Sequence, residues 1–330
     1  MTNANQGSSF ELRNLSPGLS RRRPVADEVR ESFQRSPMEL PTKYLYAIDG
    51  SDIFDKITDL PEYYVSRAET EALTDAVSEI ASLGSWARIV EIGAGFSKKT
   101  RILLDAFGSR RNMTYAPFDI SDGALTHATT RLALEYPTIE ICAYVGDFLT
   151  EDLEVALREG HGNLVLFLGA TLGNFTFAER GDFYRRFARA STESDALLIG
   201  VDLVKDPNVI EAAYNDAAGV TAEFNLNAIR FVQRELGANI TTEDFEHRAV
   251  YLPRHQVVEM RLYARRPLTI TFTKGDLPSY AMAQGSYILT ELSYKFTREG
   301  VNRDLQYSGL RLTGWWMDSM ERTALALVSI

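Results

Sequence analysis

The segment from Arg88 to Thr100, RIVEIGAGFSKKT, constrains the fold of this chain more than any other segment. An apolar run that ends in an acid and two glycines is typical of a strand entering a tight turn, because glycine lacks Cβ and tolerates positive φ. Such a turn lets the backbone approach a nucleotide-like ligand closely. Residues 98–107 carry apolar side chains at helical spacing, so a helix follows the turn and its N-terminus faces the same ligand. Strand, turn and helix together predict the start of a Rossmann-like sheet.

Two better-known glycine motifs do not match this turn. A dinucleotide fingerprint needs a third glycine three residues after the second, where this chain has Lys98. A P-loop needs glycine at the same position, just before Lys99. The remaining pattern of Glu91, Gly93 and Gly95 resembles motif I of class I S-adenosylmethionine-dependent methyltransferases. Alone, so short a pattern also fits an α/β protein that binds no nucleotide.

Composition narrows the class of protein. A length of 330 residues allows one large or two medium packed units. The formal charge of −10 argues against nucleic acid as a partner, and we interpret the short run Arg21–Arg23 as a solvated N-terminal segment. We expect a monomer that acts on a small molecule.

The cysteine and histidine content predicts a protein of a reducing compartment that has no metal site. The single Cys142 lies in the apolar stretch TIEICAYV, which predicts a buried strand thiol. The four histidines are scattered without a helical ligand pair or a cysteine partner, so we expect no metal site. No run of about 18 apolar residues occurs, and the polar N-terminus has no apolar signal core. We therefore predict a cytoplasmic protein that does not bind membranes.

Strand and helix patterns alternate from the glycine turn to Pro207. Asp119 ends the second predicted strand, about 24 residues beyond Gly95 and close to the interval at which an acid meets a ribose in dinucleotide folds. Asp147 and Phe148 follow the third strand. Further strands are predicted over residues 114–119, 139–145, 163–168 and 196–201, and helices over 98–107, 121–136 and 178–189. Five such units predict a parallel sheet with helices on both faces.

Outside this region the pattern differs. The first forty residues are polar, contain three prolines, and predict a loosely ordered arm before helical segments that reach residue 83. Past Pro207, one long helix over 209–236 and strands over 245–262 and 269–272 predict an inserted unit. The segments LRLTGWWMD and TALALVSI predict two final strands that return to the first sheet.

From about Leu40 to its end, the chain resembles the histidine-specific Nα-methyltransferases that make hercynine in ergothioneine biosynthesis. The matching segments are LPTKYLYAIDGSDIFDKITDLPEYY, VEIGAGFSKKTRILLDAF, VLFLGATLGNFT, DLVKD, AAYNDAAGVTAEFNLN, VEMRL and TELSYKF. Several separated motifs in the right order are far more specific than one glycine turn. The resemblance implies an α/β fold in which a class I Rossmann-like methyltransferase sheet is joined to a second, smaller α+β substrate-binding domain.

We place the methyltransferase domain at residues 73–204 and 296–330, and the substrate-binding domain at 1–72 and 205–295. The resemblance also implies which residues hold S-adenosylmethionine. Each implied residue type suits one part of this ligand: bare backbone at the turn suits its amino acid end, an acceptor suits the ribose hydroxyls, and an acid with an aromatic ring suits adenine. The implied cofactor residues are Gly93, Gly95, Lys99, Asp119, Asp147 and Phe148.

The substrate residues are likewise implied by matching motifs. Tyr63, Asn174 and Tyr214 match residues that hold the carboxylate and α-amine of the amino acid. Glu291 and Ser293 match those that hold the imidazole, with Met260 as an apolar wall near the ring. Because Glu291 and Ser293 are two apart on a predicted strand, their side chains share one face. By pattern alone, such a pair is more often a solvated face.

The implied reaction is transfer of three methyl groups to the neutral α-amine of L-histidine. Tyr46 and Tyr63 are the candidate catalytic side chains, since a hydroxyl or water can relay the amine proton and an aromatic face attracts the growing cation. Glu291 can accept the ring N–H of histidine, which favours histidine over tryptophan or tyrosine. A relative that methylates another aromatic amino acid, such as L-tryptophan, and a sensor that binds S-adenosylmethionine without catalysis are the alternatives.

Overall fold

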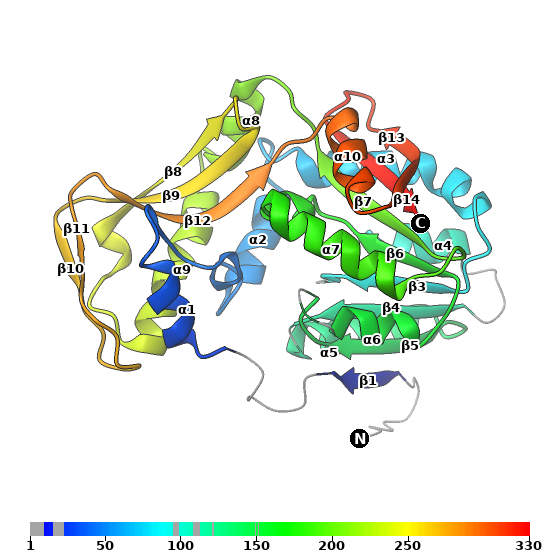
Figure 1. The fold of residues 1–330 in the computed structure, drawn as a ribbon, viewed down its shortest axis with the longest axis horizontal. Coiled ribbons are helices and arrows are strands. Elements are labelled where there is room, and N and C mark those ends of the chain that lie inside the picture. Colours follow the sequence, from blue (N-terminus) through cyan, green and yellow to red (C-terminus); the bar gives the residue numbers. More distant parts are fainter. Residues whose placement is uncertain are drawn as a thin grey trace. The chain divides into compact units, whose positions relative to one another are not determined.

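The computed structural model describes residues 10–15, 23–94, 99–107, 113–120, 122–148, 150 and 152–330. These residues form two compact units (Figure 1). The first, here called the sheet unit, comprises described residues within 1–19, 67–203 and 296–330. The second unit comprises those within 20–66 and 204–295. The predicted boundary at residues 72 and 73 differs from this division, which changes unit between residues 66 and 67, near the start of helix α3 (Val65–Ser82), and which assigns residues 1–19 to the sheet unit instead of the second unit.

The sheet unit is built on eight strands in the order β1-β5-β4-β3-β6-β7-β14-β13. Their bounds are β1 (Glu11–Asn14), β3 (Arg88–Ile92), β4 (Thr114–Asp119), β5 (Glu140–Val145), β6 (Asn163–Phe167), β7 (Ala196–Asp202), β13 (Arg311–Met317) and β14 (Thr323–Ser329). The first six in this order run parallel, and β14 joins antiparallel between β7 and β13. The predicted Rossmann-like sheet and its terminal antiparallel pair are confirmed.

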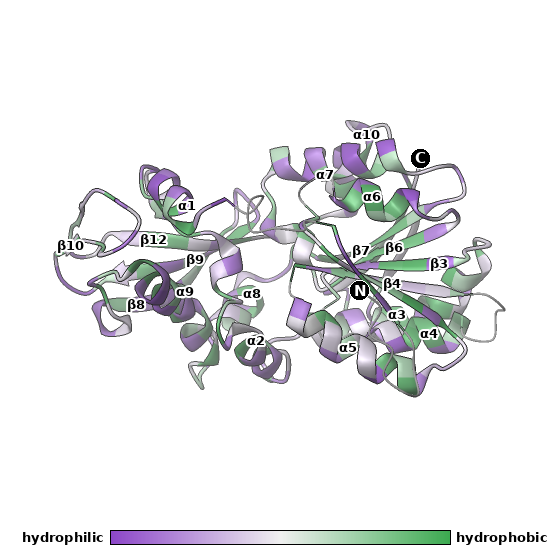
Figure 2. Ribbon diagram, turned by 90° about the horizontal axis from the view of Figure 1, so that it is seen from below, coloured by the Kyte–Doolittle hydropathy of each residue, from purple (hydrophilic) through white to green (hydrophobic). Residues whose placement is uncertain are grey.

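Helices cover both faces of this sheet, with α6, α7 and α10 on one side and α3, α4 and α5 on the other (Figure 2). The added bounds are α4 (Thr100–Phe107), α5 (Asp122–Glu135), α6 (Asp152–Arg158), η2 (Thr171–Asn174), α7 (Phe177–Ala190) and α10 (Arg298–Gln306). Strands β3, β6 and β7 are buried along their whole length, which explains why their sequences are mostly apolar. Ile89 and Leu198 meet Leu103 and Phe107 in the core beneath α4.

The expectation of a loosely ordered N-terminal arm is wrong for its described parts. Residues Glu11–Asn14 form β1, which extends the sheet by pairing parallel with β5. The pairing is stable because Leu12 packs against the buried Leu125 and Val145. Further along, α1 (Val25–Ser32) is a regular helix with a buried Val29.

The second unit contains a four-stranded sheet in the order β2-β12-β9-β8, with a separate ribbon of two strands. The strands are β2 (Met38–Glu39), β8 (Phe245–Leu252), β9 (Val257–Ala264), β10 (Leu268–Ile270), β11 (Tyr280–Met282) and β12 (Tyr287–Tyr294). The helices besides α1 are η1 (Thr42–Tyr44), α2 (Gly50–Thr58), α8 (Pro207–Tyr214), α9 (Val220–Leu236) and η3 (Thr242–Asp244). No helix in the described parts of either unit is long and apolar enough to cross a membrane.

The single helix predicted over residues 209–236 is instead two helices. Helix α8 ends at Tyr214, and α9 begins at Val220 after Gly219, which has a φ of 75°. The carboxylate of Asp216 accepts hydrogen bonds from the backbone N–H groups of Val220 and Thr221, at 2.9 and 2.7 Å. An acid that caps the next helix competes with continuation of the first, so the chain breaks after Tyr214. Likewise, the strand predicted over 245–262 is a hairpin of β8 and β9.

Candidate functional site

The glycine turn of the sheet unit follows a buried acid. Glu91 accepts hydrogen bonds from the hydroxyls of Thr100 and Tyr115, and burial raises the pKa of its carboxyl. Gly93 has a φ of 69°, and a Cβ built on it would meet nothing within 4 Å. Glycine is therefore favoured here by backbone conformation, and the space beside it is open to a ligand. Gly95, the other predicted glycine of this turn, lies outside the described residues.

Lys99 forms an ion pair with Glu69, an acid on α3 that is only 1% exposed. Both carboxylate oxygens of Glu69 also accept from the backbone N–H of Gly169, at 2.8 and 2.9 Å. The buried carboxylate of Glu69 on α3 thus contacts both Lys99, which follows the glycine turn, and the loop after β6. Sequence reasoning missed Glu69, although an acid on the helix face that carries the buried Leu73 and Ala76 was a readable signal.

Three further predicted cofactor residues lie at the carboxyl ends of neighbouring parallel strands. Asp119 is the last residue of β4 and is paired in register with Val145, the last residue of β5. Asp147 and Phe148 follow β5 directly, and both are partly exposed. The ring of Phe148 lies 5.6 Å from that of Phe167, so it is anchored on the core while one part remains accessible. This edge is where open α/β sheets bind their ligands.

Asn174 lies at the same edge, since it ends η2 in the loop after β6. Two successive residues of this loop have positive φ, 79° at Gly169, which glycine tolerates, and 55° at Ala170, which is strained for a residue with a Cβ. Its Thr171 hydroxyl donates to the carbonyl of Leu168 at 3.0 Å. The sheet unit therefore gathers Asn174 and the described cofactor candidates along one edge.

The remaining candidates lie in the second unit, where aromatic rings form a chain of contacts. The ring of Tyr46 lies 5.4 Å from Phe54 and 5.0 Å from Phe224. The ring of Tyr63 lies 6.2 Å from Phe54 and 6.3 Å from Tyr214, both edge to face. Such contacts fix the rings in place and present tyrosine hydroxyls together.

Glu291 and Ser293 lie on β12, and both are buried, at 7% and 4% exposure. They are therefore not the solvated face that their pattern alone favours. Met260 stands directly opposite Glu291 on β9 and is 1% exposed. Burial raises the pKa of Glu291 to about 7, and the positive charge of Lys295 opposes this shift. A carboxyl in this environment can either accept or donate a hydrogen bond near neutral pH.

Tyr46 retains its proton under these conditions. Burial raises the pKa of its hydroxyl well above the usual value, and the nearby Glu291, Tyr63 and Tyr214 raise it further. The four side chains are thus close enough for their charges to influence the pKa of Tyr46. Tyr46 can donate a hydrogen bond or present its ring, but it is a poor base.

Lys295 is a functional candidate that sequence reasoning missed. Its ammonium donates to the hydroxyl oxygens of Tyr214 and Ser293, at 2.8 and 2.9 Å, and lies 4.6 Å from the centre of the Tyr214 ring. The two hydroxyls also bond to each other at 2.8 Å. A signal was present, because Glu291, Ser293 and Lys295 alternate at a spacing of two and thus share one face.

His247 supports this group from β8. Its Nε2 donates to the backbone carbonyl of Tyr214 at 2.9 Å, while its Nδ1 accepts from the amide of Asn225 at 2.8 Å. This pairing selects the neutral ring, and burial lowers the pKa of the imidazole. Asn225 in turn accepts from the hydroxyl of Thr290, the residue before Glu291. His247 therefore holds the backbone of Tyr214 directly and the residue before Glu291 through Asn225.

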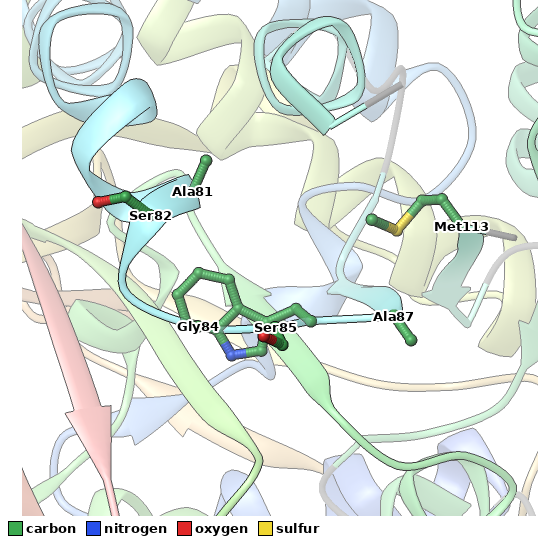
Figure 3. Close-up of a pocket in the computed structure, with 7 residues that line it drawn as sticks. Ala81, Ser82, Gly84, Ser85, Ala87 and Met113 are labelled. Atoms are coloured by element: carbon green, nitrogen blue, oxygen red, sulfur yellow. The ribbon is translucent and has the colours of Figure 1, made fainter. Parts of the chain in front are cut away.

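A surface hollow of about 500 Å³ lies elsewhere in the sheet unit (Figure 3). It is found at the amino end of β3, the edge opposite to the glycine turn. Its lining contains no carboxylate, imidazole, thiol or amine. The lining residues are Ala81, Ser82, Gly84, Ser85, Trp86, Ala87 and Met113. Among the described residues, no three histidine, cysteine, aspartate or glutamate side chains are grouped as metal ligands would be.

Comparison with known proteins gives consistent matches over almost the whole chain. The family model described as histidine-specific methyltransferase, SAM-dependent, matches residues 25–330. The histidine N-alpha-methyltransferase of Mycolicibacterium smegmatis is 42% identical over 91% of this chain and 93% of its own length. The enzyme of the same name from Mycobacterium tuberculosis is 37% identical, with coverage of 92% and 94%. Ergothioneine biosynthesis protein 1 of Neurospora crassa is 30% identical over 85% of this chain and 32% of that longer protein.

Proposed function

Because the chain belongs to the family of S-adenosylmethionine-dependent histidine-specific methyltransferases, we propose that it trimethylates the α-amine of L-histidine to give hercynine, a step of ergothioneine biosynthesis. The observation that carries the assignment to histidine is the buried Glu291 with Ser293 on one strand face and Met260 opposite. The monomeric state, the cytoplasmic location and independence from metals stay predictions from the sequence.

The edge of the sheet unit fits the methyl donor. Gly93 offers open space at a positive φ, Asp119 offers an acceptor for ribose hydroxyls, and Asp147 with Phe148 offers an acid and a ring for adenine. Lys99 adds a positive charge that Glu69 holds in place. When bound, S-adenosylmethionine supplies an electrophilic methyl group on a sulfonium.

Selection of the amino acid depends on Glu291. Its carboxylate can accept the ring N–H of histidine while Met260 covers one side of the planar ring. A phenyl ring would leave this buried carboxyl without a matched partner, at a cost of about 1–3 kcal/mol. The pocket chemistry therefore favours histidine.

The amine must lose its proton before each methyl transfer, because an ammonium has no lone pair. Tyr46 and Tyr63 are the proposed catalytic residues, and they act by donating hydrogen bonds and presenting ring faces. Since the pKa of Tyr46 is raised, its hydroxyl does not remove the proton. Attraction between an aromatic face and the growing ammonium contributes roughly 0.5–2 kcal/mol per contact. Such attraction retains the monomethyl and dimethyl intermediates for the next transfer.

Incubation with L-histidine and S-adenosylmethionine, followed by mass analysis of the amino acid, tests the proposal. We expect successive additions of one, two and three methyl groups, ending at the trimethylated product. Hercynine itself is the matched control, because its amine has no position left for methylation. Binding of S-adenosylmethionine with no methylated product would favour the sensor that lacks catalysis.

A further inference from the structure

We propose that Lys295 is a positioning residue that directs the hydroxyls of Tyr214 and Ser293 toward the amino acid. Through them it makes the pocket select ligands that carry a carboxylate. This inference rests on the proposed function. The sequence motifs did not assign a role to this lysine. The role is instead indicated by three properties of Lys295: its burial, its hydrogen-bond pattern and its position on the same strand face as Glu291.

Lys295 is 2% exposed, and lysine is almost never buried to this degree unless polar groups compensate it. Its backbone N–H is fixed by the carbonyl of Gln256 in the turn between β8 and β9, at 2.6 Å. Its ammonium then reaches both Tyr214 and Ser293 within 2.9 Å. Removing a charge from water costs several kcal/mol, so a structural role alone would be served better by an apolar side chain.

The direction of the hydrogen bonds follows from the donors available. An ammonium has three N–H donors and no acceptor, so the oxygens of Tyr214 and Ser293 must both accept from Lys295. Each hydroxyl has one proton, and one of the two protons forms the bond between them. The other hydroxyl proton is therefore directed to an acceptor outside this group of three side chains. Because Lys295 accepts no hydrogen bond, the hydroxyls of Tyr214 and Ser293 together act as a hydrogen-bond donor.

A positive charge beside that donor favours an anionic acceptor. Hydrogen bonds to ionised groups are roughly twice as strong as those between neutral pairs. Tyr214 matches one of the family residues that hold the carboxylate and α-amine of the amino acid, and Lys295 lies against both its ring and its hydroxyl. Glu291, at the other end of the same strand face, provides the acceptor for the ring. The face therefore presents a positive charge to one end of a histidine molecule and a carboxyl group to the other.

The test compares L-histidine with histamine, which keeps the imidazole and the amine but lacks the carboxylate. Calorimetric titration of the full chain, saturated with S-adenosylhomocysteine to prevent turnover, gives both affinities. For Lys295→Met we expect the affinity for L-histidine to fall about tenfold or more, and that for histamine by less than about threefold. The KM for S-adenosylmethionine should not change.

Lys205 provides a matched control in the same unit. Its ammonium donates to the hydroxyl of Tyr64 at 2.8 Å and lies 4.6 Å from the centre of that ring, so Lys205→Met removes the same kind of contact elsewhere. We expect this variant to bind both ligands as the wild type does. Lys295→Gln keeps N–H donors without the charge and serves if Lys295→Met unfolds. In Lys295→Gln the affinity for L-histidine should also fall more than the affinity for histamine.

Equal losses for L-histidine and histamine in the Lys295 variants would overturn the proposal, as would an equal preferential loss in Lys205→Met. Failure of the proposed function has a different signature, because the wild type would then not methylate histidine at all. In that case the same variants are compared with L-tryptophan and tryptamine. A preferential loss of L-tryptophan would support the role of Lys295, and equal losses would overturn it.

Discussion

Gly200 leaves the space that the carboxylate of Glu69 occupies. A Cβ built on Gly200 in β7 would lie only 1.6 Å from Oε1 of Glu69, so no side chain fits there while the acid keeps its position. The same acid holds Lys99 and the backbone N–H of Gly169. A glycine in the middle of a buried strand is thus tied to the residues around the predicted cofactor site.

Replacement of Gly200 by alanine should displace Glu69 and destabilise the protein. Overpacking of this kind costs about 1–3 kcal/mol, and the shift of Lys99 should also weaken S-adenosylmethionine binding. Denaturant unfolding and calorimetric titration measure the two effects. Gly123→Ala is the matched control, since a Cβ at this exposed helix position meets nothing within 4 Å. Equal unfolding free energies for the two variants would show that Glu69 does not need the space.

Glu291→Gln should stabilise the protein at alkaline pH while lowering activity toward histidine. Because the pKa of Glu291 rises from 4.5 to about 7 on folding, the native state prefers the protonated acid. Stability is unaffected below pH 4.5, falls as the pH rises to about 7, and is lower by about 3 kcal/mol above it. The neutral amide avoids this cost. Chemical unfolding at pH 4.5 and pH 8 measures the effect, and a variant no more stable than the wild type at pH 8 would contradict it.

His247 should make the protein less stable in mild acid. Its pKa is lowered on folding, so protons bind more readily to the unfolded chain. Stability is therefore fully present above the unfolded value of about 6.5 and falls as the pH decreases through it. His247→Gln should flatten the dependence of Tm on pH between 7 and 5. An unchanged slope in this variant would assign the acid sensitivity to other groups.

Tyr63→Phe should weaken binding of the amino acid. The substitution keeps the ring contacts with Phe54 and Tyr214 but removes the hydroxyl, for an expected loss of about 0.5–1.5 kcal/mol. The KM for histidine measures the effect. Tyr44→Phe is the control, because it removes a buried hydroxyl that donates to Glu28 at 2.6 Å. If Tyr63→Phe has wild-type kinetics, Tyr63 is not part of the site.

The sheet and the edge that carries the cofactor candidates were predictable because local patterns specify them. An apolar run followed by glycines defines β3 and its turn, Asp119 is the last residue of β4, and Asp147 lies two residues after the end of β5. The second unit was less predictable. The break between α8 and α9 there depends on one cap by Asp216. In the sheet unit, the pairing of β1 was also unpredictable, because it depends on a distant strand.

The roles of Glu69 and Lys295 could not be predicted for a different reason. A charged residue in a helix or at a strand end is usually solvated, and nothing in its immediate neighbours shows that the fold buries it. Glu69 is buried because Gly200, more than a hundred residues away, leaves room for it. Lys295 is buried because Tyr214 from α8 reaches the same strand face. Both positions depend on tertiary contacts between segments that are distant in sequence.

Competition between amino acids in one vessel tests the central claim most directly. Purified protein is incubated with S-adenosylmethionine and equal concentrations of L-histidine, L-tryptophan and L-tyrosine, and the methylated products are quantified by mass spectrometry. We predict trimethylated histidine as the dominant product, at a rate that falls in Glu291→Gln. Preferential methylation of L-tryptophan or L-tyrosine by the wild type would contradict the assignment of Glu291 to the imidazole and of the chain to histidine.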